Sequence, residues 1–209
     1  MDAQTIRHWV QESARVLGEQ RQALTDLDAA IGDADHGVNM DRGFKAAVRR
    51  VEGLPEDATP GAILRATGAA VMSSVGGASG PLWGSALRRA GQRLGEAPEF
   101  SSQALAEMLA EALQAMQKLG GAQPGDKTMI DALAPAVEAL QARVSEGASP
   151  AEALTAAREA AEAGRDATIP LQARKGRASY LGERSIGHLD PGAASAVMIL
   201  HALEDAARA

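Results

Sequence analysis

Cysteine is absent from the 209 residues, and aromatic side chains make up only 2% of them. Without cysteine the chain has no disulfides, no thiolate chemistry and none of the usual structural zinc sites, so any metal must bind oxygen or imidazole ligands. A core with so few rings must be filled by alanine, leucine, valine, isoleucine and methionine, and many alanines favour closely packed helices over sheets. The composition therefore predicts an all-α fold.

Long apolar runs and an excess of positive charge are also missing. No segment approaches the roughly 20 apolar residues of a membrane span, and the net charge of −6 offers no basic surface for nucleic acid. The first 20 residues combine charges with helical apolar spacing, unlike a signal peptide. We therefore expect a cytoplasmic protein with neither membrane nor nucleic acid as a partner, and a single domain over residues 1–209.

Apolar residues recur at helical spacing in eight segments. The clearest start is Ser149-Pro150 with Glu152, a capping-box pattern, and Asp190-Pro191 resembles the start of a last helix. Residues 168–189 lack periodicity and are too long for a simple connection, which is typical of functional loops. The predicted helices cover about residues 6–17, 40–51, 60–74, 79–94, 102–120, 126–144, 150–164 and 191–203.

The segment LDAAIGDADHG crowds Asp28, Asp33 and Asp35 into a short turn. Three such carboxylates repel one another unless protons or cations intervene, and a hard divalent cation is the economical answer. A helix cap or an exposed turn is the alternative for a lone Asp-x-Asp pair. An EF-hand does not fit, because its twelfth position would be Phe44 instead of a bidentate glutamate. Magnesium completed by a phosphorylated ligand suits this cluster best.

The segment SSVGGASGPLWG places small residues before a helix, where backbone N–H groups can approach an anion. Neither a P-loop pattern nor a strand followed by G-x-G-x-x-G occurs in the chain, which excludes those two nucleotide folds. The glycines could instead serve only a tight corner between helices.

Two further segments carry polar residues at helix starts or in loops. In GDKTM, Thr128 could bond a ligand, Met129 could pack on a purine and Lys127 could pair with a phosphate, although such residues are often simply a helix start. In ARKGRASYLGERSIGHLDPGA, clustered basic residues could stabilise a phosphoryl group in transfer, or form a solvated loop. His36 and His188 lie within motifs, whereas His8 and His201 fit structural positions on helices.

Four stretches resemble, in the family's order, the signatures of the L subunits of phosphoenolpyruvate-dependent dihydroxyacetone kinases: LDAAIGDADHG, SSVGGASGPL, GDKTM and ARKGRASYLGERSIGHLDPGA. The similarity covers nearly the whole chain, and no motif departs from the family pattern. It implies an antiparallel barrel of eight amphipathic helices with a nucleotide site at one end, which agrees with the eight predicted helices.

The resemblance also implies the residues of the site. Aspartates matching Asp28, Asp33 and Asp35 hold two Mg²⁺ ions that bridge the phosphates of a tightly bound ADP or ATP. Arg177 is the expected catalytic group, and Thr128 joins the expected nucleotide contacts as a helix-start hydroxyl. The other residues expected to line the nucleotide pocket are His36, Gly37, Val38, Asn39, Ala78, Ser79, Gly120, Met129, Arg177, Asp190, Pro191 and Gly192.

The implied reaction is a relay. Bound ADP is rephosphorylated in place by a phosphohistidine phosphotransferase partner, the M subunit, and the ATP then phosphorylates dihydroxyacetone on a separate K subunit. One alternative is the nucleotide domain of a kinase that exchanges ATP, which is normally fused to further domains; the chain's end at Ala209 favours the stand-alone form. A second alternative is an ADP-loaded coactivator of a transcription regulator.

Overall fold

The computed structural model describes all 209 residues and contains nine α-helices, one 3-10 segment and no strand. The predicted all-α class is therefore confirmed, and the predicted count of eight helices is one too low. The elements are α1 (Ala3–Glu19), α2 (Arg21–Ile31), α3 (His36–Glu52), α4 (Pro60–Ser74), α5 (Ser79–Leu94), α6 (Ser102–Gly120), α7 (Met129–Ser145), α8 (Pro150–Asp166), the 3-10 segment η1 (Arg177–Ser185) and α9 (Pro191–Arg208).

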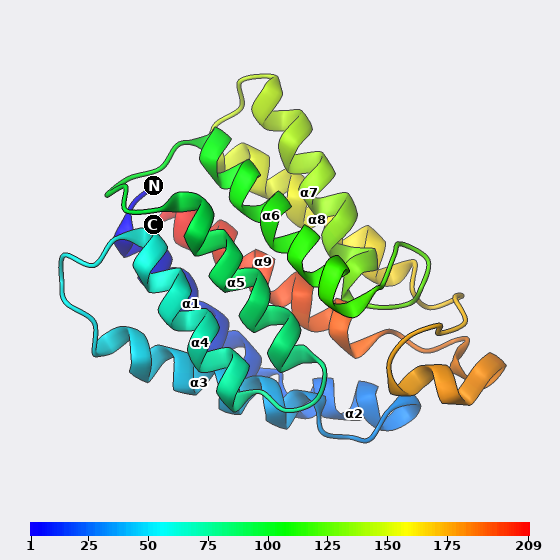
Figure 1. Cartoon of the computed structure of the whole chain (residues 1–209). Helices are drawn as coiled ribbons and strands as arrows, with labels where there is room; N and C mark the ends of the chain where they lie inside the picture. Colours follow the sequence, from blue (N-terminus) through cyan, green and yellow to red (C-terminus); the bar gives the residue numbers. More distant parts are fainter.

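Eight of the helices contact one another in a closed order. α1 packs on α3, each helix from α3 to α8 packs on the next, and α9 packs back on α1. α2 stands outside this order and contacts α3, α9 and η1 instead. It lies with η1 at one end of the bundle, whereas both chain termini lie at the other end (Figure 1). None of the helices combines the length and apolar character needed to cross a membrane.

Aliphatic side chains from these helices form one continuous core, as the scarcity of aromatics predicts. Both tryptophans are buried, and Nε1 of Trp9 in α1 donates to the carbonyl of Ile199 in α9 at 2.8 Å. Glycines let α4 and α5 approach until their backbones touch, because a Cβ at Gly61 would lie 2.2 Å from the Gly95 carbonyl oxygen. This contact holds the start of α4 against the end of α5.

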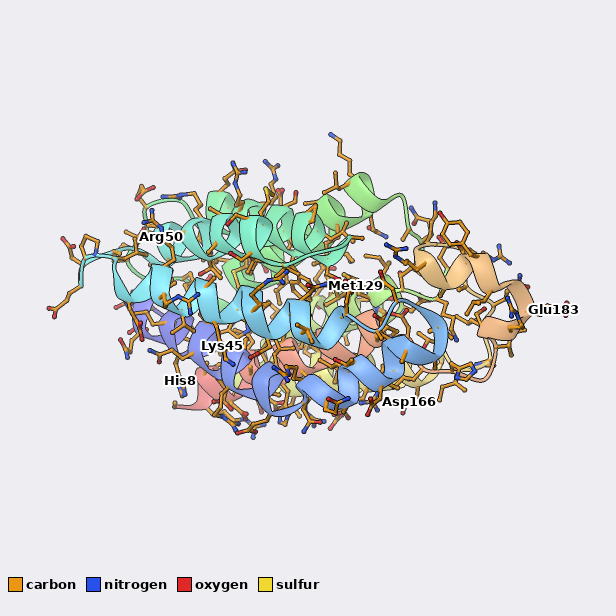
Figure 2. All side chains as sticks on the ribbon, turned by 90° about the horizontal axis from the view of Figure 1, so that it is seen from below. His8, Lys45, Arg50, Met129, Asp166 and Glu183 are labelled. Atoms are coloured by element: carbon orange, nitrogen blue, oxygen red, sulfur yellow. The ribbon has the colours of Figure 1, made fainter.

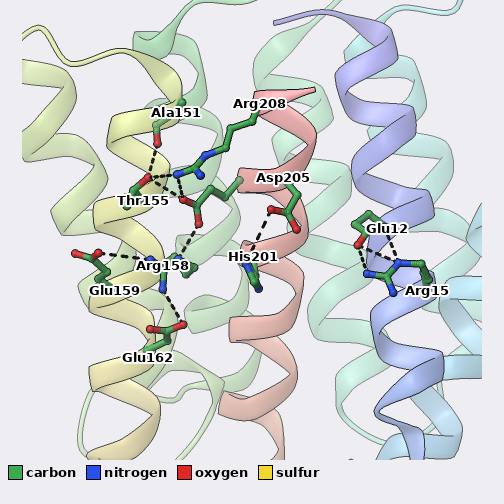
Figure 3. A network of polar contacts seen from close by, with 11 residues as sticks. Glu12, Arg15, Ala151, Thr155, Arg158, Glu159, Glu162, His201, Asp205 and Arg208 are labelled. Atoms are coloured by element: carbon green, nitrogen blue, oxygen red, sulfur yellow. Dashed lines mark hydrogen bonds and ion pairs between the residues drawn. The ribbon is translucent and has the colours of Figure 1, made fainter.

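A buried carboxylate joins α8 to α9 on the side of the bundle (Figure 3). Glu204 is 3% exposed and accepts hydrogen bonds from Thr155 Oγ1 at 2.7 Å and from Arg158 Nε at 2.8 Å. Arg208 donates to the same carboxylate. Every partner is a side chain of the two helices, so this network is a structural link between α8 and the last turns of α9.

The helix missed by sequence reasoning is α2. Its buried residues are Leu24, Asp28 and Ile31, so a charged side chain occupies the middle of the inward stripe and breaks the apolar pattern. The start of α7 also differs, at Met129 instead of near residue 126. Lys127 has a φ of 61°, which ends any helical path before Thr128 caps α7.

Other boundaries follow their local signals. The capping box at Ser149 and Glu152 is confirmed at the start of α8, and α6 ends at Gly121, whose φ of 63° is left-handed. Residues 168–189 connect α8 to α9, as predicted, and include η1. η1 extends beyond the helix ends, and Glu183 marks its outer side (Figure 2).

Candidate functional site

A cavity of about 360 Å³ lies at the end of the bundle opposite the two termini (Figure 1). Sites for small molecules typically measure roughly 300 to 1,000 Å³. Segments far apart in the sequence form its walls, and most of the residues predicted for the site lie among them. Those residues are Asp28, Asp33, Asp35, His36, Asn39, Ala78, Ser79, Gly120, Thr128, Met129, Arg177, Asp190, Pro191 and Gly192.

Two predicted contacts, Gly37 and Val38, do not line this cavity. Gly37 faces α2, where an added Cβ would lie 2.0 Å from the Arg21 carbonyl oxygen. Val38 points to solvent and is 42% exposed. The first turn of α3 therefore presents His36 and Asn39 to the cavity, and Gly37 instead permits the close approach of α2.

The three predicted aspartates converge. Asp28, in the last turn of α2, and Asp33 and Asp35, in the following turn, each offer a carboxylate oxygen, and these oxygens lie within 4.8 Å of one another. Between the last two, Ala34 has a φ of 60°, a strained conformation for a residue with a side chain. Asp35 is the N-cap residue of α3, yet its side chain makes no cap hydrogen bond. Capping therefore does not explain the cluster, and the donor set suits a divalent cation.

Asp28 also organises the turn itself. Its Oδ2 accepts hydrogen bonds from the backbone N–H groups of Asp35 at 2.9 Å and His36 at 3.1 Å. Gly32 is required here, because a Cβ at this position would lie 2.0 Å from Asp28 Oδ1. One oxygen of Asp28 thus shapes the turn, and the other remains available to a cation.

Four helices begin at the cavity: the lining includes first-turn residues of α3, α5, α7 and α9. Helix N-termini carry partial positive charge and free N–H groups, which favour anions. α5 has no side-chain cap, so its first N–H groups have no side-chain acceptor, whereas the first N–H of α3, that of His36, already donates to Asp28. The C-terminal ends of α2 and α6 also line the cavity, and α2 contributes Asp28 to it. The cavity therefore has a cation-binding side and an anion-binding side.

Asn39 joins the glycine-rich turn to α3. Arg42 Nη2 donates to Asn39 Oδ1 at 2.8 Å, and Arg42 Nε donates to the Ser74 carbonyl, also at 2.8 Å. The amide of Asn39 lies against Gly76, where a Cβ would be 2.8 Å from Oδ1. With its oxygen occupied, Asn39 presents its NH₂ group as the free donor near the turn that precedes Ser79.

His36 fixes the start of α3 to the start of α9. Its Nε2 lies 2.9 Å from Ser195 Oγ, and that hydroxyl donates to the Gly192 carbonyl at 3.0 Å. His36 is therefore linked to Ser195 directly and, through that hydroxyl, to the first turn of α9. Burial lowers the pKa of His36, and the charges of Asp28 and Asp35 only partly oppose this effect. A neutral, doubly anchored His36 is a structural contact of the site and a poor proton carrier.

Arg177 begins η1 and reaches back to the aspartate turn. Its Nε lies 2.8 Å from Asp33 Oδ2, while its side chain is 70% exposed. An ion pair so open to water contributes little to stability. Arg177 is thus an exposed positive charge that lines the cavity and pairs with Asp33.

In the segment GDKTM, one of the three residues considered from the sequence has a different role in the structure. Thr128 caps α7 through the N–H of Ile130 at 3.1 Å, and Met129 lines the cavity. A phosphate contact was one of two interpretations of Lys127, the other being a simple helix start, but its Nζ already donates to the carbonyls of Thr168 and Ile169, at 2.7 and 3.4 Å, and to that of His188. Lys127 is therefore a structural residue held by backbone carbonyls, and it does not pair with a phosphate.

Sequence reasoning missed two supporting residues. Asp131 accepts hydrogen bonds from the N–H groups of Gly125 at 2.6 Å and Thr128 at 2.7 Å, and so shapes the turn before α7. The Thr-x-x-Asp capping pattern could have revealed it. No sequence pattern marks Ser195, because its contact with the site exists only where His36 of α3 packs against α9. Lys175 lines the cavity, and His188 contributes only its backbone carbonyl to the contacts near it.

Asp190 caps α9 and titrates near neutrality. Its Oδ2 accepts from the Ala193 N–H at 2.7 Å. Burial raises the pKa of Asp190 to about 7, and Asp131 acts in the same direction, while the Ala193 N–H and the Lys127 charge oppose it. Between pH 5 and 7 the folded protein holds a proton that the unfolded chain has lost, so stability falls as pH rises.

We expect Asp190→Asn to remove this dependence. The amide keeps the cap acceptor but carries no charge. Because the lowered pKa of His36 acts in the opposite direction over this range, the contribution of Asp190 is the difference between wild type and Asp190→Asn. Without nucleotide, the free energy of unfolding of wild type relative to Asp190→Asn should fall by about 2.5 kcal/mol between pH 5 and pH 7.5, since one pKa unit corresponds to roughly 1.4 kcal/mol. Urea unfolding at several pH values measures this slope. Asp2→Asn, at the cap of α1, is the control because the pKa of Asp2 is lowered and lies below this range. An unchanged slope in Asp190→Asn would exclude Asp190 as its source.

Comparisons with known proteins agree on one family. Residues 30–205 match the family model of the DAK2 domain. The chain is 43% identical to the ADP-binding subunit of PEP-dependent dihydroxyacetone kinase from Escherichia coli (strain K12), covering 97% of this chain and 96% of the relative. It is 41% identical to the ADP-binding subunit of PEP-dependent dihydroxyacetone kinase 2 from Listeria innocua, covering 97% and 94%. It is also similar to the dihydroxyacetone kinase from C. freundii solved with AMP-PNP and Mg²⁺, with 29% identity and a TM-score of 0.70 over 96% of this chain and 33% of that chain.

Proposed function

This chain belongs to the DAK2 domain family, and on that premise we propose that it is the nucleotide-carrying subunit of a dihydroxyacetone kinase. The observation that carries the proposal is the cavity in which three carboxylates face the N-terminal ends of four helices. A nucleoside diphosphate with magnesium has the complementary charges. The relatives matched along nearly their whole length are ADP-binding subunits, which supports the same assignment.

The metal ligands in this proposal are Asp28, Asp33 and Asp35, and the expected load is two Mg²⁺ ions. The donor set fits magnesium, because its oxygens converge and those of Asp33 and Asp35 serve no helix cap. When bound, magnesium neutralises phosphate charge and orients the transferred group. The turn built on Asp28 keeps these carboxylates together before any ligand arrives.

The nucleotide contacts follow from the walls of the cavity. The uncapped N–H groups at the start of α5, next to Ala78 and Ser79, would bind phosphate oxygens, and the side of the cavity near His36 would bring in the start of α3. Met129 and Gly120 also line the cavity, and an apolar purine face would pack there, while Thr128 Oγ1 retains a free hydrogen for a polar edge. Asn39 would donate its NH₂ group, while Asp190, Pro191 and Gly192 close the cavity from α9.

Arg177 would act on the phosphoryl group itself. Its guanidinium group is exposed, stands at the rim and is held only by Asp33. A cation at Asp33 would compete for that carboxylate and free the arginine to face the transferred charge. In the proposed relay, the bound ADP is rephosphorylated in place by a phosphohistidine M subunit, and the ATP serves dihydroxyacetone on a K subunit.

Several finer expectations belong to the same proposal. The closed order of contacts from α1 to α9 supports an antiparallel barrel of eight helices, with α2 as an addition at its site end. We further propose a single domain over residues 1–209 and a cytoplasmic location. A coactivator role for the ADP-loaded form towards a transcription regulator is compatible with this site but has no observation of its own.

Two measurements test the proposal together. Mass analysis of nucleotide released from the untreated protein by acid should find about one ADP per chain. The protein combined with a K subunit and dihydroxyacetone should then turn over with a phosphoenolpyruvate-driven phosphohistidine relay, and not with free ATP alone. Turnover with free ATP alone would favour an exchanging kinase. Retained ADP without turnover from either donor would contradict the relay.

A further inference from the structure

Lys127 is a buried charge that the proposed function does not use. It is 1% exposed and lies immediately before the Thr128 cap of α7. A charged side chain removed from water needs hydrogen-bond partners, because its desolvation is costly. Burial lowers the pKa of Lys127, and the carboxylates of Asp190 and Asp131 oppose this effect. The negative charges of Asp190 and Asp131 therefore stabilise the protonated, ammonium form of Lys127.

All three partners of this amine belong to one segment. Thr168 and Ile169 accept from Lys127 Nζ at the beginning of residues 168–189, and His188 accepts at the end. The N–H of Gly187 also donates to the Ile169 carbonyl at 2.8 Å. The ammonium group therefore joins the two ends of the segment that connects α8 to α9, where loop closure costs conformational entropy.

The middle of the segment has few attachments. Ala173 and Ala178 form a small apolar cluster with Ile31 of α2, separate from the main core. The other ties are a backbone hydrogen bond from the Arg174 N–H to the Asp126 carbonyl at 3.0 Å, next to Lys127, and the exposed ion pair between Arg177 and Asp33. Because these contacts are weak, the position of Arg177 depends on how firmly the base of the segment is closed.

We propose that Lys127 is a positioning residue whose ammonium group closes the base of segment 168–189 and thereby holds Arg177 at the nucleotide cavity. The assignment rests on the proposed function for its catalytic consequence, but not for its structural one. A direct phosphate contact is excluded by geometry, since each hydrogen of the amine already faces a carbonyl oxygen. Lys127 acts on the segment that carries the arginine, and the arginine acts on the substrate.

The absence of cysteine allows a matched chemical test. Lys127→Cys provides the only thiol of the chain, which can be alkylated in denaturant and the product refolded. Alkylation with 2-bromoethylamine restores an ammonium group at the length of lysine, whereas 1-bromopropane gives a neutral side chain with the same number of heavy atoms. Wild-type protein taken through the same unfolding and refolding is the control.

We expect the aminoethyl form to match wild type, and the propyl form to differ locally. Trypsin should cut the propyl form about tenfold faster or more after Arg174, Lys175, Arg177 or Arg184, because proteolysis follows local opening. Its kcat in the reconstituted kinase should fall about tenfold, while its Kd for Mg·ADP changes less than about threefold, since the cation and phosphate ligands lie elsewhere. Equal cleavage and equal kcat in the two alkylated forms would overturn the proposal.

A second pair of variants tests the proposal without refolding, in case the alkylated Lys127→Cys protein does not refold. Lys127→Met and Glu204→Gln, produced directly in folded form, both weaken a buried charge network, but only the first lies under the segment. Faster cleavage of the segment in Lys127→Met alone supports the positioning role, and equal cleavage in both variants overturns it. If wild type itself shows no turnover, the proposed function fails while the cleavage contrast still decides the role of Lys127.

Discussion

Replacing Asp33 with alanine is expected to weaken Mg·ADP binding by about 100-fold or more and to abolish turnover. Loss of a residue behind a metal ligand already costs about 10 to 100-fold in affinity, so loss of a proposed ligand should cost at least as much. Asp33 is 39% exposed at its side chain, and its only ion pair is with the exposed Arg177. The fold should therefore tolerate the change, and the defect should be confined to the ligand.

Thermal unfolding with and without Mg·ADP separates these effects. Wild type should gain stability in proportion to the logarithm of ligand concentration over Kd, whereas Asp33→Ala should gain almost none. Without ligand, the two melting temperatures should agree within about 2 °C, because few contacts are lost. Asp57→Ala is the matched control, since it removes the same charge from an exposed loop at the other end of the bundle. Full ADP retention by Asp33→Ala in gel filtration would contradict the metal site.

Features set by neighbouring residues could be predicted from the sequence. The start of α8 follows from Ser149 and Glu152, whose side chain and backbone groups satisfy each other across one turn. The convergence of Asp28, Asp33 and Asp35 follows from their short spacing. The glycine-rich turn before Ser79 could be located for the same reason, because small residues before a helix expose N–H groups whatever surrounds them.

Features set by distant partners could not be predicted. α2 was missed because its inward stripe contains Asp28, and a buried aspartate makes sense only with the turn that it organises. For Lys127 a phosphate contact stayed open beside a simple helix start, because nothing in the sequence reveals the three carbonyls that accept from its amine. Gly37 was expected to line the cavity, but its lack of a side chain is required by α2, whose approach is a tertiary event.

Replacing Arg177 with alanine is expected to lower kcat by about 100 to 1,000-fold, because loss of one preformed donor to developing charge typically has that effect, and arginines in phosphoryl transfer contribute as much or more. The melting temperature should stay within about 2 °C of wild type, since the side chain is 70% exposed and its ion pair is surface-screened. Rates in the reconstituted kinase and thermal unfolding measure the two effects. Equal losses of rate and stability would argue against a catalytic role.

Removing Arg177 is also expected to change the affinity for Mg²⁺ in a defined direction, because Arg177 and a cation compete for Asp33. Without nucleotide, Arg177→Ala should bind Mg²⁺ more tightly than wild type, by a few-fold for the loss of one nearby positive charge in a screened site. Arg177→Lys should lose most of the rate but not gain metal affinity, since it keeps the charge and lacks the planar fork. Arg184→Ala, in the same 3-10 segment but outside the cavity, should leave both quantities unchanged. Weaker Mg²⁺ binding in Arg177→Ala would mean that the arginine helps to assemble the cation site, and that Asp33 is not the point of exchange between them.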